Sequence, residues 1–164
     1  MALISSFTSR RLADRKPPAT KQVITFNLDQ DWLAVSTDIA QKVAPIQAIY
    51  KDQESLYLPT FYEGKALQFF SLENYLTEGK SNQELDIKKG YLILFETPQK
   101  TLIAIPIHIA PVLRRIHESA FVPISLIPTL PQKVHTISRF AIRTEDEPLI
   151  FLLDYEYLTQ IATI

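Results

Sequence analysis

Apolar and polar residues alternate with a period of two along much of the chain that follows residue 22. In "QVITFNLDQDWLAVS" (22–36), the apolar residues Ile24, Phe26 and Leu28 alternate with polar ones, "DQD" interrupts the pattern, and an apolar run resumes at Trp32. Alternation on both sides of a short polar break is typical of two antiparallel strands joined by a tight turn. The pattern therefore predicts a β-hairpin at the start of the folded part of the chain.

Further segments rich in Ile, Leu, Phe and Tyr carry a strand signal, and most of the eleven prolines lie between them. We predict these strands at 45–51, 66–71, 91–96, 101–107, 134–142 and 149–154. Short helices are predicted at 36–43, 72–77, 109–118 and 155–161. Because no long helix alternates with the strands, a parallel βαβ sheet is excluded, and a mainly β, barrel-like architecture with few short helices is favoured.

One phrase occurs twice, as "KALQFFSLENYL" (65–76) and "EPLIFLLDYEYL" (147–158). Aligned on these phrases, four positions are identical: Leu67 with Leu149, Phe69 with Phe151, Tyr75 with Tyr157, and Leu76 with Leu158. Four identities between short apolar strands can arise by chance, but two lobes of similar topology, each closed by an equivalent strand, explain them better. The polar, turn-rich segment 79–90 is the predicted boundary between the lobes.

Charge is distributed unevenly along the chain. Residues 1–21 contain five basic side chains and one acidic one, whereas the 164-residue chain as a whole has a net charge of −1. We predict a flexible basic tail over 1–21, either a solvated terminus or an arm that grips an acidic partner or anionic lipid. The overall charge gives no reason to expect nucleic acid as a partner.

The apolar stretches are too short to cross a membrane. The most apolar one, 102–113, has twelve residues including two prolines and a histidine, where a spanning helix needs about 20. No secretory signal is recognisable at the N-terminus. These features predict a soluble, cytoplasmic protein without direct membrane insertion.

The sequence carries no recognisable catalytic motif. Three glycines form no phosphate-binding loop, His108, His117 and His135 lack metal-ligand spacing, and there is no cysteine for a disulfide, a thiolate site or a nucleophile. Asp154 ends an apolar strand as a phospho-accepting aspartate does, but only ten residues follow it, so we expect it to cap a C-terminal helix. We therefore predict no enzyme activity, no cofactor and no metal.

From "QVITFNLDQDWLAV" through "LYLPTFYEGKALQFFSL", "GYLILFE" and "LIAIPIHIAPVLRRI" to "ISRFAIRTEDEPLIFLLDYEYL", the chain resembles the CheW-like coupling proteins of bacterial chemosensory pathways. The resemblance covers about 22–160. It implies two SH3-like β-barrel lobes sharing a hydrophobic interface. It also implies a non-catalytic adaptor between the cytoplasmic tip of methyl-accepting chemoreceptors and the regulatory domain of a CheA-type histidine kinase, at membrane-associated receptor arrays.

Several family positions differ here. The family's hairpin glycines fall on Leu58 and Arg139, its asparagine on Phe61, its first-lobe aspartate on Ser71, and its arginine on Glu63, before the retained Gly64. A family glutamate falls on Lys42. We hypothesise that Lys42 and Glu63 form the family's ion pair with reversed polarity, the alternative being two unrelated solvated side chains.

The resemblance places partner-binding residues on the first lobe: Lys42, Phe61, Tyr62, Glu63, Gly64 and Lys65. The alternative for Phe61 and Tyr62 is burial in the core. Loss of the arginine favours a specialised pathway, of which pilus-driven twitching and phototaxis are examples. The alternative functions are a β-rich structural or assembly scaffold unrelated to a signalling kinase, and a barrel that binds a small molecule.

Overall fold

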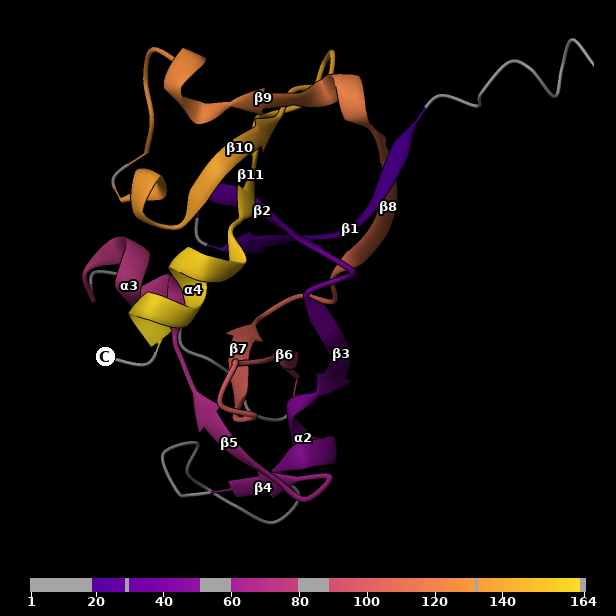
Figure 1. Cartoon of the computed structure of the whole chain (residues 1–164), viewed down its shortest axis with the longest axis vertical. Helices are drawn as coiled ribbons and strands as arrows, with labels where there is room; N and C mark the ends of the chain where they lie inside the picture. Colours follow the sequence, from indigo (N-terminus) through magenta and orange to yellow (C-terminus); the bar gives the residue numbers. More distant parts are fainter. Residues whose placement is uncertain (1–18, 29, 51–59, 80–88, 132, 163–164) are drawn as a thin grey trace, which may run out of the picture.

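The computed structural model describes residues 19–28, 30–50, 60–79, 89–131 and 133–162, which form two curled β-sheets and a few short helices (Figure 1). The six-stranded sheet contains β1 (Thr20–Leu28), β2 (Asp31–Ser36), β8 (Val112–His117), β9 (Phe121–Pro123), β10 (Ser138–Ile142) and β11 (Ile150–Leu153). The five-stranded sheet contains β3 (Ala40–Pro45), β4 (Thr60–Tyr62), β5 (Lys65–Phe69), β6 (Tyr91–Glu96) and β7 (Leu102–Ile107). The fold is mainly β, as predicted.

The two sheets share a strand arrangement. Their orders are β8-β1-β2-β11-β10-β9 and β3-β6-β7-β5-β4. In the first, β11 lies between its antiparallel partner β10 and the parallel strand β2, and in the second, β5 lies between antiparallel β4 and parallel β7. The repeated phrase therefore occupies the same place in each sheet.

Each copy of the phrase continues into a helix, α3 (Leu72–Thr77) or α4 (Tyr155–Ala162). The Ser71 hydroxyl accepts a hydrogen bond from Asn74 N at 3.3 Å, and the Asp154 carboxylate accepts one from Tyr157 N at 3.2 Å. Both side chains satisfy amide groups that have no partner within the helix. The predicted capping role of Asp154 is confirmed.

The two helices connect the sheets reciprocally. The hydroxyl of Tyr75, on α3, lies 2.8 Å from Thr136 Oγ1, just before β10 of the other sheet. The hydroxyl of Tyr155, on α4, donates to the Glu96 carbonyl oxygen at the end of β6, at 2.7 Å. Each helix thus follows a strand of one sheet and bonds to the other.

The core has three parts. A large cluster contains buried residues of both sheets and both helices, among them Phe26, Phe95, Phe151, Leu72 and Leu158. Smaller clusters belong to the five-stranded sheet and the six-stranded sheet alone. The predicted hydrophobic interface between two lobes is therefore present.

The central strand β7 explains the most apolar stretch of the sequence. All six of its residues are buried. Ile103, Ile105 and Ile107 belong to the shared cluster, and Leu102 and Ala104 to the cluster of the five-stranded sheet. Because both faces are covered, the strand is a continuous apolar run and not an alternating one.

Several predicted elements were wrong. The segment 36–43, predicted as a helix, contains a turn and the start of β3, whose backbone pairs with β6. The segment 109–118, also predicted as a helix, contains β8, which pairs with β1 after Pro111. The segment 45–51, predicted as a strand, contains the end of β3 and the helix α2 (Ile46–Ile49), and residue 51 lies outside the described residues. The strand predicted at 134–142 begins only at Ser138, after the 3₁₀ helix η3 (Val134–Thr136).

The predicted boundary at 79–90 includes 80–88, which lie outside the described residues, as do 1–18 of the predicted tail. The strands on either side of this boundary, β5 and β6, both neighbour β7 in one sheet. A cut there would divide the five-stranded sheet. The N-terminal hairpin, β1 and β2, instead joins the C-terminal strands β8 to β11.

Candidate functional site

The predicted partner-binding residues gather around the β4–β5 hairpin. Tyr62 and Lys65 are the last paired residues, so Glu63 and Gly64 form a two-residue turn. Both have positive φ, 52° and 78°. Positive φ at both central positions is the hallmark of the type I′ turn, which favours Asn and Gly. Gly64 suits this backbone, whereas Glu63 adopts a conformation that is uncommon for its residue type.

Lys42 reaches this hairpin from β3, the opposite edge of the five-stranded sheet. Its ammonium group donates a hydrogen bond to the Tyr62 hydroxyl and lies 3.9 Å from Glu63 Oε1. The curl of the sheet therefore brings its two edge strands together at these three side chains. The hypothesised pairing of Lys42 with Glu63 is present in the structure.

The electrostatics of this group are those of a surface site. The Tyr62 hydroxyl, and to a smaller extent the charge of Glu63, raise the pKa of Lys42 above its ordinary value of 10.5. The Lys42 and Glu63 side chains are 47% and 71% exposed. Water screens a pair this exposed, so it contributes little to folding stability. The pair is therefore a feature of the surface and not of the core.

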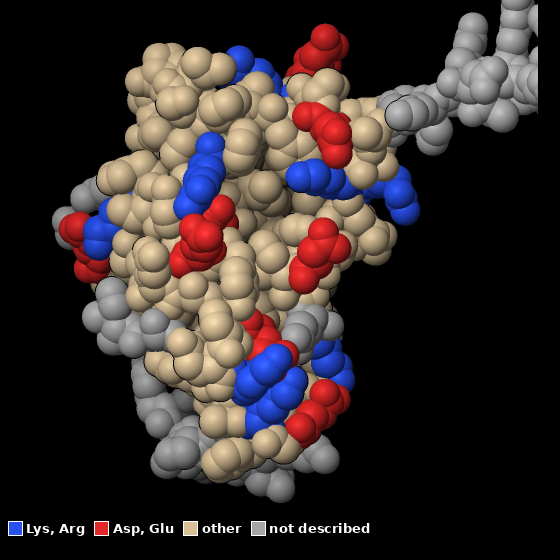
Figure 2. All heavy atoms as spheres, viewed as in Figure 1, with Lys and Arg blue, Asp and Glu red and all other residues tan. Residues whose placement is uncertain are grey.

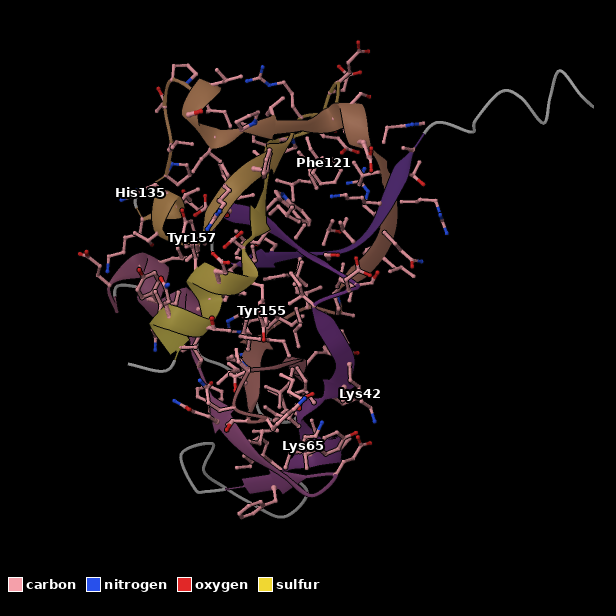
Figure 3. All side chains as sticks on the ribbon, in the orientation of Figure 1. Lys42, Lys65, Phe121, His135, Tyr155 and Tyr157 are labelled. Atoms are coloured by element: carbon pink, nitrogen blue, oxygen red, sulfur yellow. The ribbon has the colours of Figure 1, made fainter. Side chains whose placement is uncertain are left out.

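Lys65 is held by a different carboxylate. Its ammonium lies 3.1 Å from Glu96 Oε2 at the end of β6, and Lys100 lies 4.0 Å from the other oxygen of Glu96. Figure 3 shows Lys42 and Lys65 in the same lobe, on β3 and β5. The structure thus brings Lys42, Tyr62 and Glu63 into one group and places Lys65 in a second.

The two aromatic residues of β4 have different environments. Phe61 is 72% exposed, so its alternative assignment to the core is wrong. Tyr62 is half-buried and packs against the cluster of the five-stranded sheet, while its hydroxyl meets Lys42. Phe61 therefore offers an apolar contact surface, and Tyr62 fixes the position of Lys42.

A second exposed apolar region was missed by the sequence analysis. Ile109, in the connection from β7 to β8, and Val112 and Leu113, the first residues of β8, are 70%, 56% and 58% exposed. The sequence pattern predicts a helix over 109–118, and an amphipathic helix would bury its apolar face. These residues were therefore not expected at the surface. The proline at 111 was the available signal against that helix.

The connection also contains a half-buried ionisable pair. His108 Nε2 lies 2.8 Å from Glu73 Oε2, joining the end of β7 to the first turn of α3, and their side chains are 19% and 9% exposed. No group of three potential metal ligands occurs within the described ranges. None of the helices in the described part is long and apolar enough to cross a membrane.

The described surface includes hollows at two places. One, of about 390 Å³, lies between the β2–β3 turn, the β6–β7 turn and Tyr155. The other, of about 230 Å³, is lined by Trp32, Arg114, Glu147, Pro148 and Ile150. In the second hollow, Glu147 accepts hydrogen bonds from Thr144 and Arg114, which lower its pKa below the ordinary 4.5. The charges of Arg114 and Glu147 are thus already paired with each other.

Together, the two sheets of matching strand order and their shared core define the two-lobed fold of CheW-type scaffolding proteins. Among solved structures, the scaffolding protein TtCheW from Thermoanaerobacter tengcongensis is similar to this chain, with a TM-score of 0.62 over 83% of this chain and 90% of that one. The two are 16% identical, so the likeness establishes the fold. No protein-family model and no curated protein sequence matches the chain.

Proposed function

We propose that this protein is a non-catalytic adaptor that couples methyl-accepting chemoreceptors to a CheA-type histidine kinase. The observation that carries the proposal is the complete two-lobed fold, which covers 90% of a protein described as a scaffold. Surface chemistry supports it too, since exposed large apolar residues rimmed by charges are typical of protein interaction sites.

The hairpin group is the proposed contact for a partner. Phe61 supplies exposed apolar area at the edge of the five-stranded sheet, and Lys42 and Glu63 set a local charge pattern beside it. Charged groups at the rim of an interface mainly reject wrong partners and steer association. Because the family's charges have exchanged places here, the protein would prefer a partner whose facing charges are exchanged as well.

The expected preference for a partner with exchanged charges also bears on the pathway. A partner set with exchanged charges differs from that of flagellar chemotaxis, so we assign the protein to a specialised motility pathway such as pilus-driven twitching or phototaxis. The protein would act in the cytoplasm at membrane-associated receptor arrays.

The test is affinity purification of the tagged full chain from its native cells, followed by mass spectrometry. Co-purification of a CheA-type kinase and a methyl-accepting receptor is the expected result. If neither appears at low salt while other proteins do, the chain is an assembly scaffold unrelated to a signalling kinase.

The charge pair is tested by titration against that kinase's purified regulatory domain. We expect Lys42→Glu and Glu63→Lys each to weaken binding, and the double variant, which reverses both charges that face the partner, to weaken it at least as much. Lys89→Glu, an exposed change just before β6, is the matched control. If the double variant binds as well as the unaltered protein, the partner does not read these charges, and the preference for a partner with exchanged charges is wrong.

A further inference from the structure

β8 is an edge strand of the six-stranded sheet, and the orientation of its backbone can be derived. Ala19 accepts a hydrogen bond from Glu118 N at 2.9 Å, so this pair and every second pair along β1 and β8 exchange ladder bonds. Val112, Arg114 and Ile116 thus point their amides and carbonyls toward β1. Leu113, Arg115 and His117 point theirs outward.

An independent bond supports this alternation. Gln22 accepts from Thr37 N at 3.2 Å, which directs Gln22 and Ile24 toward β2 and leaves Lys21 and Val23 for β8. Within the described residues, no strand pairs with the outer side of β8. The His117 carbonyl caps the 3₁₀ helix η1 (Glu118–Ala120), so the amides of Leu113, Arg115 and His117 and the carbonyls of Leu113 and Arg115 form an open ladder of five backbone groups.

The side chains along this ladder are exposed and mainly basic. Leu113 is 58% exposed, and Arg115 and His117, on the same face of the strand, are exposed as well. Figure 2 shows Lys and Arg side chains over the region where Figure 1 places β1 and β8. Among the described residues, Arg115 forms no ion pair with a carboxylate and reaches only the Thr20 hydroxyl, at 3.4 Å.

We infer that β8 binds an extended acidic segment of another protein, which adds to the six-stranded sheet as a seventh, antiparallel strand. Backbone hydrogen bonds to the three outward residues supply the affinity. Alternate side chains of the segment supply the specificity, with an apolar residue opposite Leu113 and acidic residues opposite Arg115 and His117. This surface belongs to the sheet other than the one that carries the β4–β5 hairpin, so the inference does not depend on the proposed function.

Charge distinguishes this occupant from the two nearest alternatives. If two copies paired through β8, the register that matches all three outward residues would place Arg115 opposite the second copy's Arg115, and directly opposed like charges are destabilising. Residues 1–18 contain four basic side chains and one acidic one, so the chain's own N-terminal segment has the wrong sign for this edge. An acidic strand from another protein would place no like charge opposite Arg115 and would have the opposite sign to this edge.

The first measurement is amide hydrogen exchange on the full chain at low concentration. The amides of Leu113, Arg115 and His117 should exchange fast, and those of Val112, Arg114 and Ile116 slowly. Slow exchange of the outward amides in the free protein would overturn the inference, because the edge would already be covered.

The probe is a synthetic peptide with glutamate, glutamate and leucine at alternate positions and threonine between them, titrated into the unaltered protein. Binding should slow the exchange of the three outward amides. N-methylation of the glutamates should abolish binding, and N-methylation of the threonines, whose amides face away, should leave it intact. Equal binding of both methylated peptides would show charge attraction alone and overturn strand addition, as would absence of binding at millimolar peptide.

Variants of the peptide and of the protein test how much charge contributes to binding. A peptide with lysine in place of glutamate should bind about tenfold more weakly, and Arg115→Glu should reverse this preference. The exposed Lys89→Glu change, just before β6 of the other sheet, is the matched control and should leave both affinities unchanged. If Arg115→Glu still prefers the glutamate peptide over the lysine peptide, Arg115 takes no part in recognition and the predicted register is wrong.

Discussion

The turn at Glu63 and Gly64 allows folding stability to be separated from partner binding. Glu63 has a φ of 52° in a type I′ turn, a position where asparagine is among the preferred residues. Replacing Glu63 by Asn relieves part of the cost of a left-handed conformation, which is about 1–2 kcal/mol for an ordinary residue. It also removes the ion pair with Lys42, which is too exposed to offset that gain.

We therefore expect Glu63→Asn to raise the free energy of unfolding by about 0.5–1 kcal/mol, a Tm increase of roughly 1–4 °C for a chain of this size. Urea and thermal denaturation followed by circular dichroism measure it. The same variant should bind the kinase regulatory domain more weakly. A gain in stability together with a loss of binding would show that the glutamate serves recognition.

Lys100→Gly is the matched control. Lys100 also has a left-handed backbone, with a φ of 65°, in the β6–β7 turn, and no recognition role is assigned to it. Its replacement should stabilise the fold and leave binding unchanged. If Glu63→Asn lowers the unfolding free energy while Lys100→Gly raises it, the pair with Lys42 outweighs the turn strain and the reasoning fails.

Three further outcomes are expected. Leu158→Ala, in the fully buried part of α4, should destabilise the protein by about 2–5 kcal/mol in urea denaturation, because it opens a cavity in the core shared by both sheets. Asp154→Ala should cost about 0.5–2 kcal/mol by removing the cap of α4, whereas Asp154→Asn should recover most of that loss; equal losses would exclude the capping role. Thr144→Val should raise the pKa of Glu147 in an NMR titration, since the Thr144 hydroxyl is the main cause of its low value. Because the folded-state pKa of Glu147 is the lower one, its contribution to stability is present above pH 4.5 and is lost as the pH falls through the folded-state value, and Thr144→Val should reduce that loss.

The elements that sequence reasoning predicted well are those fixed by local chemistry. The hairpin of β1 and β2 follows from alternation, the strand β6 from a short apolar run, and the cap at Asp154 from a side chain beside its own backbone. The proximity of Lys42 to Glu63 joins opposite edges of a sheet, which alternation alone cannot show, and it came from the family resemblance.

The elements that were missed depend on partners far away in sequence. β8 is a strand because β1, about ninety positions earlier, supplies its ladder, as the pairing of Val23 with Arg114 shows. β3 likewise exists through β6. The division of the chain between the two sheets has the same cause, since it depends on β2 lying beside β11.

The placement of the N-terminal hairpin has a consequence for how the protein is made. The five-stranded sheet uses only strands between Ala40 and Ile107, so it can assemble while the ribosome is still adding residues. β2 ends at Ser36, but its neighbour β11 begins only at Ile150. At 5–20 residues per second, the nascent hairpin waits of the order of ten seconds for that neighbour, with its apolar face uncovered. Chaperone demand during translation should therefore begin with the first strands synthesised, and a ribosome stalled before Ile150 would carry a complete five-stranded sheet beside a six-stranded sheet that lacks β11.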